Sequence, residues 1–246
     1  MSNIKKSYGI LCCRPSKLDG IEILMVKRST TYHFCEFVSG HYRKQNHQHL
    51  INLFNNMTYN EKMDILSLKF QNLWYRIYME NPDKAFFQGS NVGISSIWTS
   101  SYIKKKNKFE SAFLQDSGKN LMALIAVSTN VETPWEYPKG RKNKHDEADI
   151  DTAIREFHEE TGVESDKYNI LWHLSPYVET YTDFGITYQN IYYYATASGI
   201  WNPIYTFSNK MQISETSSIK WESINKLVHM NLELTTYKRL INRFSK

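Results

Sequence analysis

The stretch from Asp149 to Thr161 is the part of this chain whose residue spacing most narrowly restricts how it can fold. Its apolar residues recur at the three- and four-residue intervals of an α-helix: Ile150, Ala153, Ile154 and Phe157. Asp149 is placed to cap the start of this helix, and Gly162 is placed to end it in a left-handed conformation. The sequence therefore predicts an amphipathic helix over residues 149–161, with its apolar side turned toward a hydrophobic core.

A second face of the predicted helix gathers three glutamates, Glu156, Glu159 and Glu160. Like charges at these spacings destabilise a helix by roughly 0.2–0.5 kcal/mol per pair, and carboxylates near its C-terminal end oppose the helix dipole. A hard divalent cation would offset that cost, because Mg²⁺ and Mn²⁺ prefer oxygen ligands and Mg²⁺ often binds protein carboxylates together with substrate phosphates. The residues alone leave two interpretations open: a solvated acidic helix, and a metal site that hydrolyses a phosphoanhydride.

The residues around this helix resemble the sequence box of the Nudix family, which is written G, five residues, E, seven residues, then REUxEExGU with U apolar. The matching positions are Gly140, Glu147, Arg155, Glu156, Phe157, Glu159, Glu160, Gly162 and Val163. One departure is present, because six residues separate Gly140 from Glu147 and Asp146 stands at the usual spacing. The distance in sequence to Arg155 favours Glu147 over Asp146 for the first acidic position.

The resemblance implies an α/β protein with the Nudix α/β/α sandwich, and an enzyme that uses Mg²⁺ or Mn²⁺. It implies metal ligands at Gly140, Glu156, Glu159 and Glu160, with the same three glutamates and Glu215 as catalytic residues. Arg155 would orient the helix by pairing with Glu147. Independently of the resemblance, the basic side chains of Lys139 and Arg141 lie beside the box in sequence and are candidates for binding substrate phosphates. Glu215 precedes a predicted strand that ends at Trp221, and a plain surface glutamate stays an equal alternative there. Glu179 and Asp183 are further acidic candidates.

The rest of the chain alternates between strand and helix patterns. Short runs of β-forming residues at 7–14 and 21–28 predict a hairpin, and spacings over 47–81 predict helices, one of them capped by Thr58 and Glu61. A loop is expected at 88–101, and other elements at 117–128 (helix), 132–140, 168–184, 185–197 and 219–224 (strands), and 233–244 (helix). We expect residues 1–35 and 126–246, with the box at 140–163, to form one domain, and residues 36–125 to form a helical insertion in it.

Motifs outside the box resemble the mRNA-decapping Nudix enzymes of large DNA viruses, of the African swine fever virus type. They are EFVSGHY (36–42), LINLFNNMTYNE (50–61), LKFQNLWYRIYME (68–80), WEYPKG (135–140) and AIREFHEETG (153–162). The resemblance implies hydrolysis of the RNA cap pyrophosphate, which releases 7-methylguanosine diphosphate (m7GDP) and 5′-monophosphate RNA. It further implies an insertion that contacts RNA and forms a homodimer, and a viral protein in the cytoplasm of the infected cell that shuts down host messages.

The predicted insertion is basic, with 11 Lys and Arg against 7 Asp and Glu in residues 36–125, whereas residues 126–246 carry 13 against 16. Basic side chains that displace counterions from the phosphate backbone favour RNA as a partner. The candidates for RNA contact are Arg43, Lys44, Lys62, Lys69, Arg76, Lys104, Lys105, Lys106 and Lys108. Each of them alone is better explained as a solvated side chain, and the Lys104–Lys108 cluster is the best candidate as a unit.

Other functions stay open from the sequence. The same box would serve hydrolysis of diphosphoinositol polyphosphates or of free nucleotides, and a non-catalytic RNA-binding module would show a damaged REUxEE, which is intact here. No aromatic residue can be assigned to a cap stack. No run approaches the roughly 20 apolar residues of a membrane helix, so we expect no membrane insertion. Three cysteines without paired spacing indicate a reducing compartment.

Overall fold

The computed structural model describes residues 4–16, 20–78, 96–183, 186–204 and 215–227. The chain divides into two compact units, one formed by residues 1–28 with 135–246 and the other by residues 29–134. The domain boundaries predicted near 35 and 125 both fall inside the second unit. Within the described residues, no helix is long and apolar enough to cross a membrane. The predicted C-terminal helix at 233–244 lies outside the described residues.

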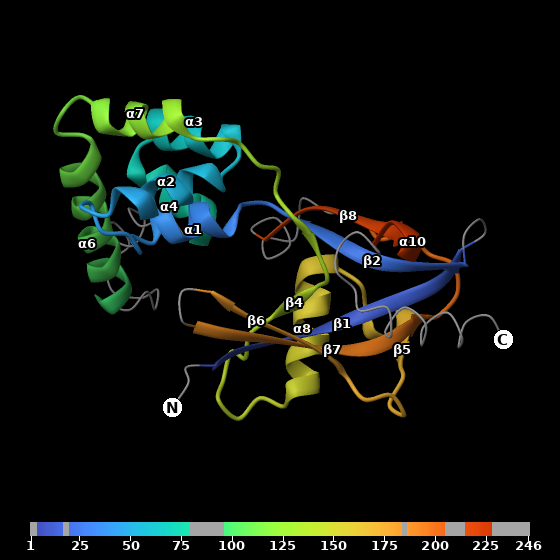
Figure 1. Cartoon of the computed structure of the whole chain (residues 1–246). Coiled ribbons are helices and arrows are strands. Elements are labelled where there is room, and N and C mark those ends of the chain that lie inside the picture. Colours follow the sequence, from blue (N-terminus) through green and yellow to red (C-terminus); the bar gives the residue numbers. More distant parts are fainter. Residues whose placement is uncertain (1–3, 17–19, 79–95, 184–185, 205–214, 228–246) are drawn as a thin grey trace. The chain divides into compact units, whose positions relative to one another are not determined.

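The first unit is built on one mixed sheet (Figure 1). Its strands are β1 (Ile4–Ser16), β2 (Gly20–Arg28), β3 (Trp135–Glu136), β4 (Lys139–Gly140), β5 (Tyr168–Ile170), β6 (Tyr177–Asp183), β7 (Ile186–Ala197) and β8 (Thr216–Ser223). The central order is β3-β2-β1-β7-β5, with β4 paired to β1, β6 to β7 and β8 to β2. The pair β1 and β7 is parallel and the others are antiparallel. The hairpin predicted from the first two apolar runs is confirmed.

Helices cover both faces of this sheet. The helix α8 (Asp149–Thr161) lies against β1 (Figure 1). Its residues Ala153 and Phe157 share a buried cluster with Ile10 of β1. Because successive strand residues point to opposite faces, Leu11 packs on the other face, in a cluster that includes Ile224 of the short helix α10 (Ile224–Leu227). A one-turn 3-10 helix, η1 (Ser165–Lys167), leads from α8 to β5. The predicted α/β/α sandwich is confirmed.

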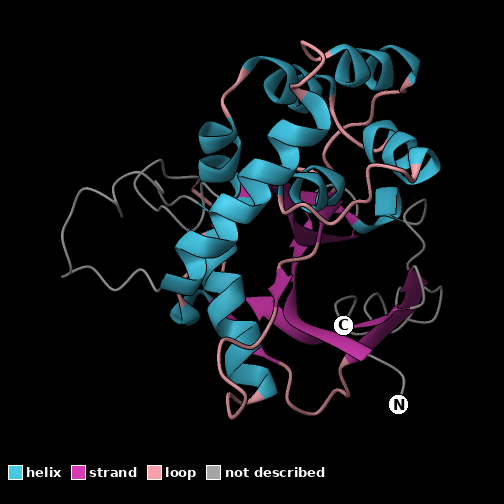
Figure 2. Ribbon diagram, turned by 90° about the vertical axis from the view of Figure 1, so that its left-hand side faces the viewer, coloured by secondary structure: helices cyan, strands magenta, loops and turns pink. Residues whose placement is uncertain are grey.

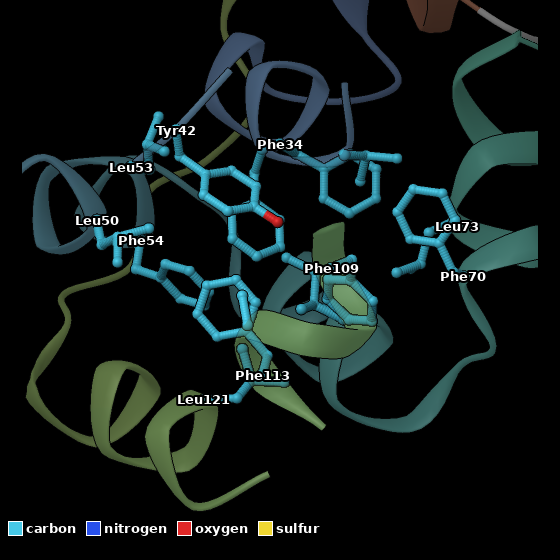
Figure 3. Packing of buried hydrophobic residues seen from close by; sticks show 14 of the residues in the cluster. Phe34, Tyr42, Leu50, Leu53, Phe54, Phe70, Leu73, Phe109, Phe113 and Leu121 are labelled. Atoms are coloured by element: carbon cyan, nitrogen blue, oxygen red, sulfur yellow. The ribbon is translucent and has the colours of Figure 1, made fainter. Parts of the chain in front are cut away.

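All regular structure in the described part of residues 29–134 is helical (Figure 2). The helices are α1 (Tyr32–Val38), α2 (His47–Asn55), α3 (Tyr59–Ser67), α4 (Phe70–Tyr78), α6 (Ser96–Phe113) and α7 (Lys119–Val127). Aromatic rings dominate their shared core, and Figure 3 labels Phe34, Phe54 and Phe113 among them. Phe37 contacts Phe54 edge to face with ring centroids 5.2 Å apart. The loop predicted at 88–101 is wrong for residues 96–101, which form the first part of α6.

A buried carboxylate joins the first and third helices of this unit. Glu61 is fully buried, and its carboxylate accepts hydrogen bonds from the Thr31 backbone N–H (2.6 Å), the Thr31 hydroxyl (2.9 Å) and the Thr58 backbone N–H (2.8 Å). The Thr58 side chain in turn accepts from the Glu61 N–H, so the predicted capping box is confirmed. One side chain thus satisfies donors at the N-termini of both α1 and α3.

Glu61→Ala is expected to destabilise the protein by about 3 kcal/mol, because two buried donors and one partly buried donor lose their acceptor at once. The free energy of unfolding can be measured by urea denaturation of the full chain followed by circular dichroism. Gln115→Ala, at an exposed position of the same unit, is the control and should change stability by less than about 0.5 kcal/mol. Equal unfolding midpoints for the two variants would contradict the joining role of Glu61.

Candidate active site

The carboxylates of α8 differ sharply in their exposure. Glu156 is 7 % exposed and Glu160 is 3 % exposed, whereas Glu159 is only partly buried. Glu156 and Glu160 lie one turn apart, on the edge of the helix next to Ala153 and Phe157, so packing of the apolar face carries both carboxylates into the protein. The solvated acidic helix that the residues alone left open therefore does not describe Glu156 and Glu160.

Arg155 organises the acidic residues around it. Its Nε and Nη2 donate to the two carboxylate oxygens of Glu147 (2.8 and 3.3 Å), and its Nη1 donates to Glu156 (2.7 Å) and to Glu159 (3.0 Å). The hydrogen bond from Arg155 is the main reason that the pKa of Glu147 falls to about 2. Asp146 is exposed, so Glu147 is the acidic residue that pairs with Arg155.

The start of α8 differs from the prediction that Asp149 caps the helix. Ala148 occupies the N-cap position without a side-chain hydrogen bond, and Asp149 is the first helical residue. The carboxylate of Asp149 instead forms an ion pair with the ammonium of Lys142 (2.7 Å). That partner comes from the preceding loop, and the ion pair replaces the local capping bond.

The strand β4 passes directly against the buried carboxylates. The backbone N–H of Lys139 donates to Glu160 (3.0 Å). A Cβ atom added to Gly140 would lie 2.0 Å from Oε2 of Glu156, so only glycine allows this approach. Gly140 pairs with Tyr8 of β1, which fixes the strand in place beside the helix. The backbone at Gly140 and the two carboxylates of α8 therefore border one small space.

Electrostatic repulsion and burial raise the pKa values of these carboxyls. Burial is the main cause of the pKa of about 7 for Glu156, and it acts against the lowering effect of Arg155. Burial also raises the pKa of Glu160 well above its ordinary value, and the negative charge of Glu136 adds to it. The pKa of Glu215 is raised because protein atoms displace water from part of its carboxyl, although the residue as a whole is exposed just before β8. Glu215 also raises the pKa values of Glu156 and Glu160, so it belongs to the same acidic cluster.

The donor chemistry of this cluster fits a divalent metal ion. Within the described residues, no three His, Cys, Asp or Glu side chains stand close enough together to form a ready-made metal site. The carboxylates of Glu156 and Glu160 are nevertheless buried oxygen donors whose negative charges lack full compensation, which is the kind of site a hard cation stabilises. Glu159 and the Gly140 backbone are adjacent to Glu156 and complete the candidate donor set.

Removing metal ions should make the stability of the protein fall as the pH rises. The pKa of Glu156 is about 7 in the folded protein and 4.5 in its ordinary state, so the folded chain holds this proton more tightly than the unfolded chain. The stabilisation is complete below about pH 4.5 and is lost as the pH rises through 7, with an effect on the order of 2 kcal/mol. Thermal melting in a chelator, from pH 5 to 8, measures it.

Two comparisons further test the predicted fall in stability with rising pH. Glu156→Gln should reduce the pH dependence by the part that Glu156 contributes, because glutamine carries no proton to lose, while Glu160 and Glu215 keep their raised pKa values. Mn²⁺ should raise the melting temperature of the unmodified protein more at pH 8 than at pH 5.5, since metal binding requires deprotonated carboxylates. Equal metal stabilisation at both pH values would contradict the account of the cluster.

A second ion-pair group beside the cluster was missed by sequence reasoning. Glu136 of β3 pairs with the ammonium of Lys139 (2.6 Å) and with the guanidinium of Arg28 (3.1 Å). Lys139 thus lies next to the acidic cluster, and Arg141 is exposed while its backbone oxygen accepts from Arg155 (2.8 Å). The only sequence signal for Glu136 was its place in the WEYPKG motif just before the box.

The weaker acidic candidates lie on β6. Glu179 is exposed and accepts a hydrogen bond from Asn190 of β7 (2.9 Å). Asp183 ends the strand, next to the undescribed residues 184 and 185. The electrostatic causes of the raised Glu156 and Glu160 pKa values include Glu215 and neither of these two residues. Glu215 is therefore the better of the three candidates for a further acidic group.

The basic candidates of the helical unit divide into exposed and engaged side chains. Lys62 is buried and donates to Ser128 (2.8 Å), Asn130 (3.0 Å) and the Thr129 carbonyl. Its ammonium therefore stabilises the unit from inside, and the prediction that Lys62 contacts RNA is wrong. Arg76 pairs with Asp64, and Lys108 donates to the Gly40 and Tyr42 carbonyls (2.8 and 2.5 Å). The exposed or partly exposed remainder is Arg43, Lys44, Lys69, Lys104, Lys105 and Lys106.

Comparison with known proteins gives a consistent result. The NUDIX domain profile matches residues 111–244. The mRNA-decapping protein g5R of African swine fever virus is 35% identical over 243 residues in isolates from a Kenyan pig and a Namibian warthog, and the match covers 94% of this chain and 92% of each relative. Among solved structures, the Ap4A hydrolase of C. elegans in a binary complex is 12% identical with a TM-score of 0.44, covering 98% of this chain and 94% of that one.

Proposed function

Because the chain belongs to the Nudix hydrolase family, we propose that it removes the 5′ cap from mRNA by hydrolysing the cap pyrophosphate to m7GDP and 5′-monophosphate RNA. The observation that carries the proposal is the buried pair Glu156 and Glu160 beside Gly140, at the positions that the family box assigns to metal ligands. Similarity to viral decapping proteins along 94% of the chain supports capped mRNA as the substrate.

Each residue of the site has a separate proposed role in the hydrolysis. Glu156, Glu159, Glu160 and the Gly140 carbonyl would hold Mg²⁺ or Mn²⁺, which would neutralise the phosphate oxygens and lower the pKa of the attacking water. Arg155 holds the carboxylates of Glu156 and Glu159 in place through its Nη1 hydrogen bonds. Glu215, whose raised pKa brings it closer to neutral pH, accepts the proton of the attacking water. Lys139 and Arg141 contact the substrate phosphates.

A product assay tests this proposal. RNA labelled in the cap is incubated with the protein and Mg²⁺ or Mn²⁺, and the released nucleotide is identified by chromatography. We expect m7GDP, with release that stops in a chelator. A parallel reaction contains a diphosphoinositol polyphosphate, and another contains a free nucleoside diphosphate. Turnover of either compound without release from capped RNA would replace decapping by that alternative activity, and binding of RNA without any turnover would indicate a non-catalytic module.

We propose that the helical unit binds the RNA chain that follows the cap. The ammonium of Lys44 reaches the backbone oxygen of Ser111 on α6 (3.5 Å), and Lys108 binds the Gly40 and Tyr42 carbonyls. These contacts place Arg43 and Lys44 beside the helix that carries Lys104. We call Arg43, Lys44 and Lys104 the basic surface. The unit is also the proposed site of homodimer formation, and the proposed location of the protein is the cytoplasm of the infected cell, where loss of caps shuts down host messages.

Changing the basic surface to alanine at all three positions should weaken binding of a long RNA by about tenfold and reduce the salt dependence of binding. Hydrolysis of a short cap dinucleotide should be unchanged, because it lacks the RNA body. Filter binding at several salt concentrations measures the first effect. The control variant Lys119→Ala with Lys167→Ala removes two exposed positive charges elsewhere and should bind RNA nearly as the unmodified protein does. An equal loss of RNA affinity in both variants would contradict binding of RNA at the basic surface.

A further inference from the structure

The antiparallel pair of β6 and β7 presents a face of aromatic and polar residues. In the register of the two strands, Tyr181 is opposite Tyr188 and Glu179 is opposite Asn190. Since alternate residues of a strand share a face, these four side chains lie on one side of the sheet. It is the side opposite α8, because Tyr192 of the same β7 series belongs to the other hydrophobic cluster.

The two tyrosines form an open aromatic platform. Their rings are stacked with centroids 5.2 Å apart and an interplanar angle of 11°. Tyr181 is 48 % exposed, so part of its ring surface faces solvent. The ammonium of Lys5 lies 5.7 Å from the centroid of Tyr188. An exposed stacked pair of this kind adds little to a core, and it offers a flat surface to another planar ring.

The strand register connects the platform face to the backbone at Gly140, because Tyr8 of β1 is opposite Gly140 of β4 and also opposite Ile191 of β7, the residue after Asn190. The Tyr137 ring, which directly precedes the segment carrying Lys139 and Gly140, packs edge to face against Tyr192 of β7 (5.4 Å). The pKa of Tyr181 is raised mainly by burial, and the charges of Lys139 and Glu136 act on it as well. Lys139 and Glu136 also act on the pKa of Glu160, so the tyrosine and this carboxylate respond to the same two charges.

The polar neighbour of the platform suits the edge of a guanine. Glu179 is exposed, and Asn190, which is 5 % exposed, donates to one oxygen of its carboxylate (2.9 Å) and restricts its orientation. A carboxylate is an acceptor-only group, and guanine presents two adjacent donors, N1–H and N2–H. Methylation at N7 gives the base a positive charge, which strengthens its attraction to the electron-rich face of a tyrosine and to a nearby carboxylate.

We propose that the methylated guanine of the RNA cap binds on this face, stacked on the Tyr181 and Tyr188 platform, with its N1–H and N2–H donating to Glu179. The inference rests on the proposed decapping function and adds the residues that select the base. The methylated cap is favoured over the unmethylated cap because only the former carries a positive charge, which the exposed ring of Tyr181 and the carboxylate of Glu179 attract.

The test compares KM values for methylated and unmethylated capped RNA, together with equilibrium binding of m7GDP and GDP measured by calorimetry. Tyr181→Ala and Glu179→Gln should each raise KM for methylated capped RNA by about tenfold, with a smaller change in kcat. Tyr181→Ala should also reduce the preference for m7GDP over GDP, whereas Tyr181→Phe should retain it. Trp172→Ala, at a side chain that is 71 % exposed in the same unit, is the aromatic control and should behave as the unmodified protein.

Two outcomes separate this inference from the decapping proposal. If the unmodified protein releases m7GDP from RNA and Tyr181→Ala leaves KM and the m7GDP preference unchanged, the base-binding face is wrong and decapping stands. If the unmodified protein releases no cap nucleotide, decapping itself fails. A loss of m7GDP and GDP binding by equal factors in Tyr181→Ala would also overturn the inference, because the platform would then not sense methylation.

Discussion

Glu160→Gln is expected to lower kcat for cap release by about a thousandfold. The substitution keeps the size of the side chain and its hydrogen bond from Lys139, and it removes the negative charge that would hold a divalent cation. Glu160 is 3 % exposed, so solvent is largely excluded from the position of the lost charge. Single-turnover kinetics with cap-labelled RNA, in saturating Mg²⁺ or Mn²⁺, measure the change in the chemical step.

The same variant separates a catalytic loss from a folding loss. Because burial raises the pKa of Glu160, an uncharged side chain is favoured there when no metal is bound, and Glu160→Gln should melt at or above the temperature of the unmodified protein in a chelator at pH 8. Glu164→Gln, at an exposed position just after α8, is the control and should keep full activity. A Glu160→Gln protein that is folded and within tenfold of full activity would rule out its metal-binding role.

Gly140→Ala is expected to lower kcat by about a hundredfold while the protein still folds. The added methyl group would lie 2.0 Å from Oε2 and 2.4 Å from Oε1 of Glu156, so the carboxylate must move away from Gly140. The end of a flexible side chain can shift at small cost in stability, and a displacement of about 1 Å at a catalytic group costs on the order of a hundredfold in rate. Decapping rates and melting temperatures of the variant test both parts.

Gly199→Ala is the matched control, because it is expected to change the stability of the protein and not its activity. Gly199 has a φ of +90° and open space around its Cα, so alanine strains the backbone and contacts nothing. We expect a lower melting temperature with normal activity. Normal activity in Gly140→Ala would show that the Glu156 carboxylate does not need its place beside β4.

The local features of the site were predictable from sequence because they depend on neighbours in the chain. The helix over 149–161 follows from the spacing of Ala153 and Phe157 and from Gly162, which has a φ of +67° at the helix end. The Arg155 and Glu147 pair also follows from the box, since both residues stand at family positions. The Asp149 cap was wrong, because the Asp149 side chain is held by Lys142 from the preceding loop, and no helix-capping rule includes that partner.

Features that depend on distant parts of the chain were not predictable. The sequence predicted Lys62 to be an exposed basic side chain. It is buried because residues 128–130, distant in sequence, accept its three hydrogen bonds. Helix α6 begins earlier than the composition of 88–101 indicated, and it is held by the packing of Tyr102 and Phe109 against Phe70. The stacking of Tyr181 on Tyr188 depends on the strand register, which a single sequence does not specify.

The central claim is that the buried carboxylates of α8 hold divalent ions at the cleaved pyrophosphate. Anomalous scattering from a crystal of the protein soaked with Mn²⁺ and a non-hydrolysable cap analogue tests it most directly. We predict a manganese peak within coordination distance of Glu156, Glu160 and the Gly140 carbonyl, in contact with the analogue phosphates. An ordered analogue with no manganese peak at these carboxylates, or with manganese bound elsewhere, would contradict the account.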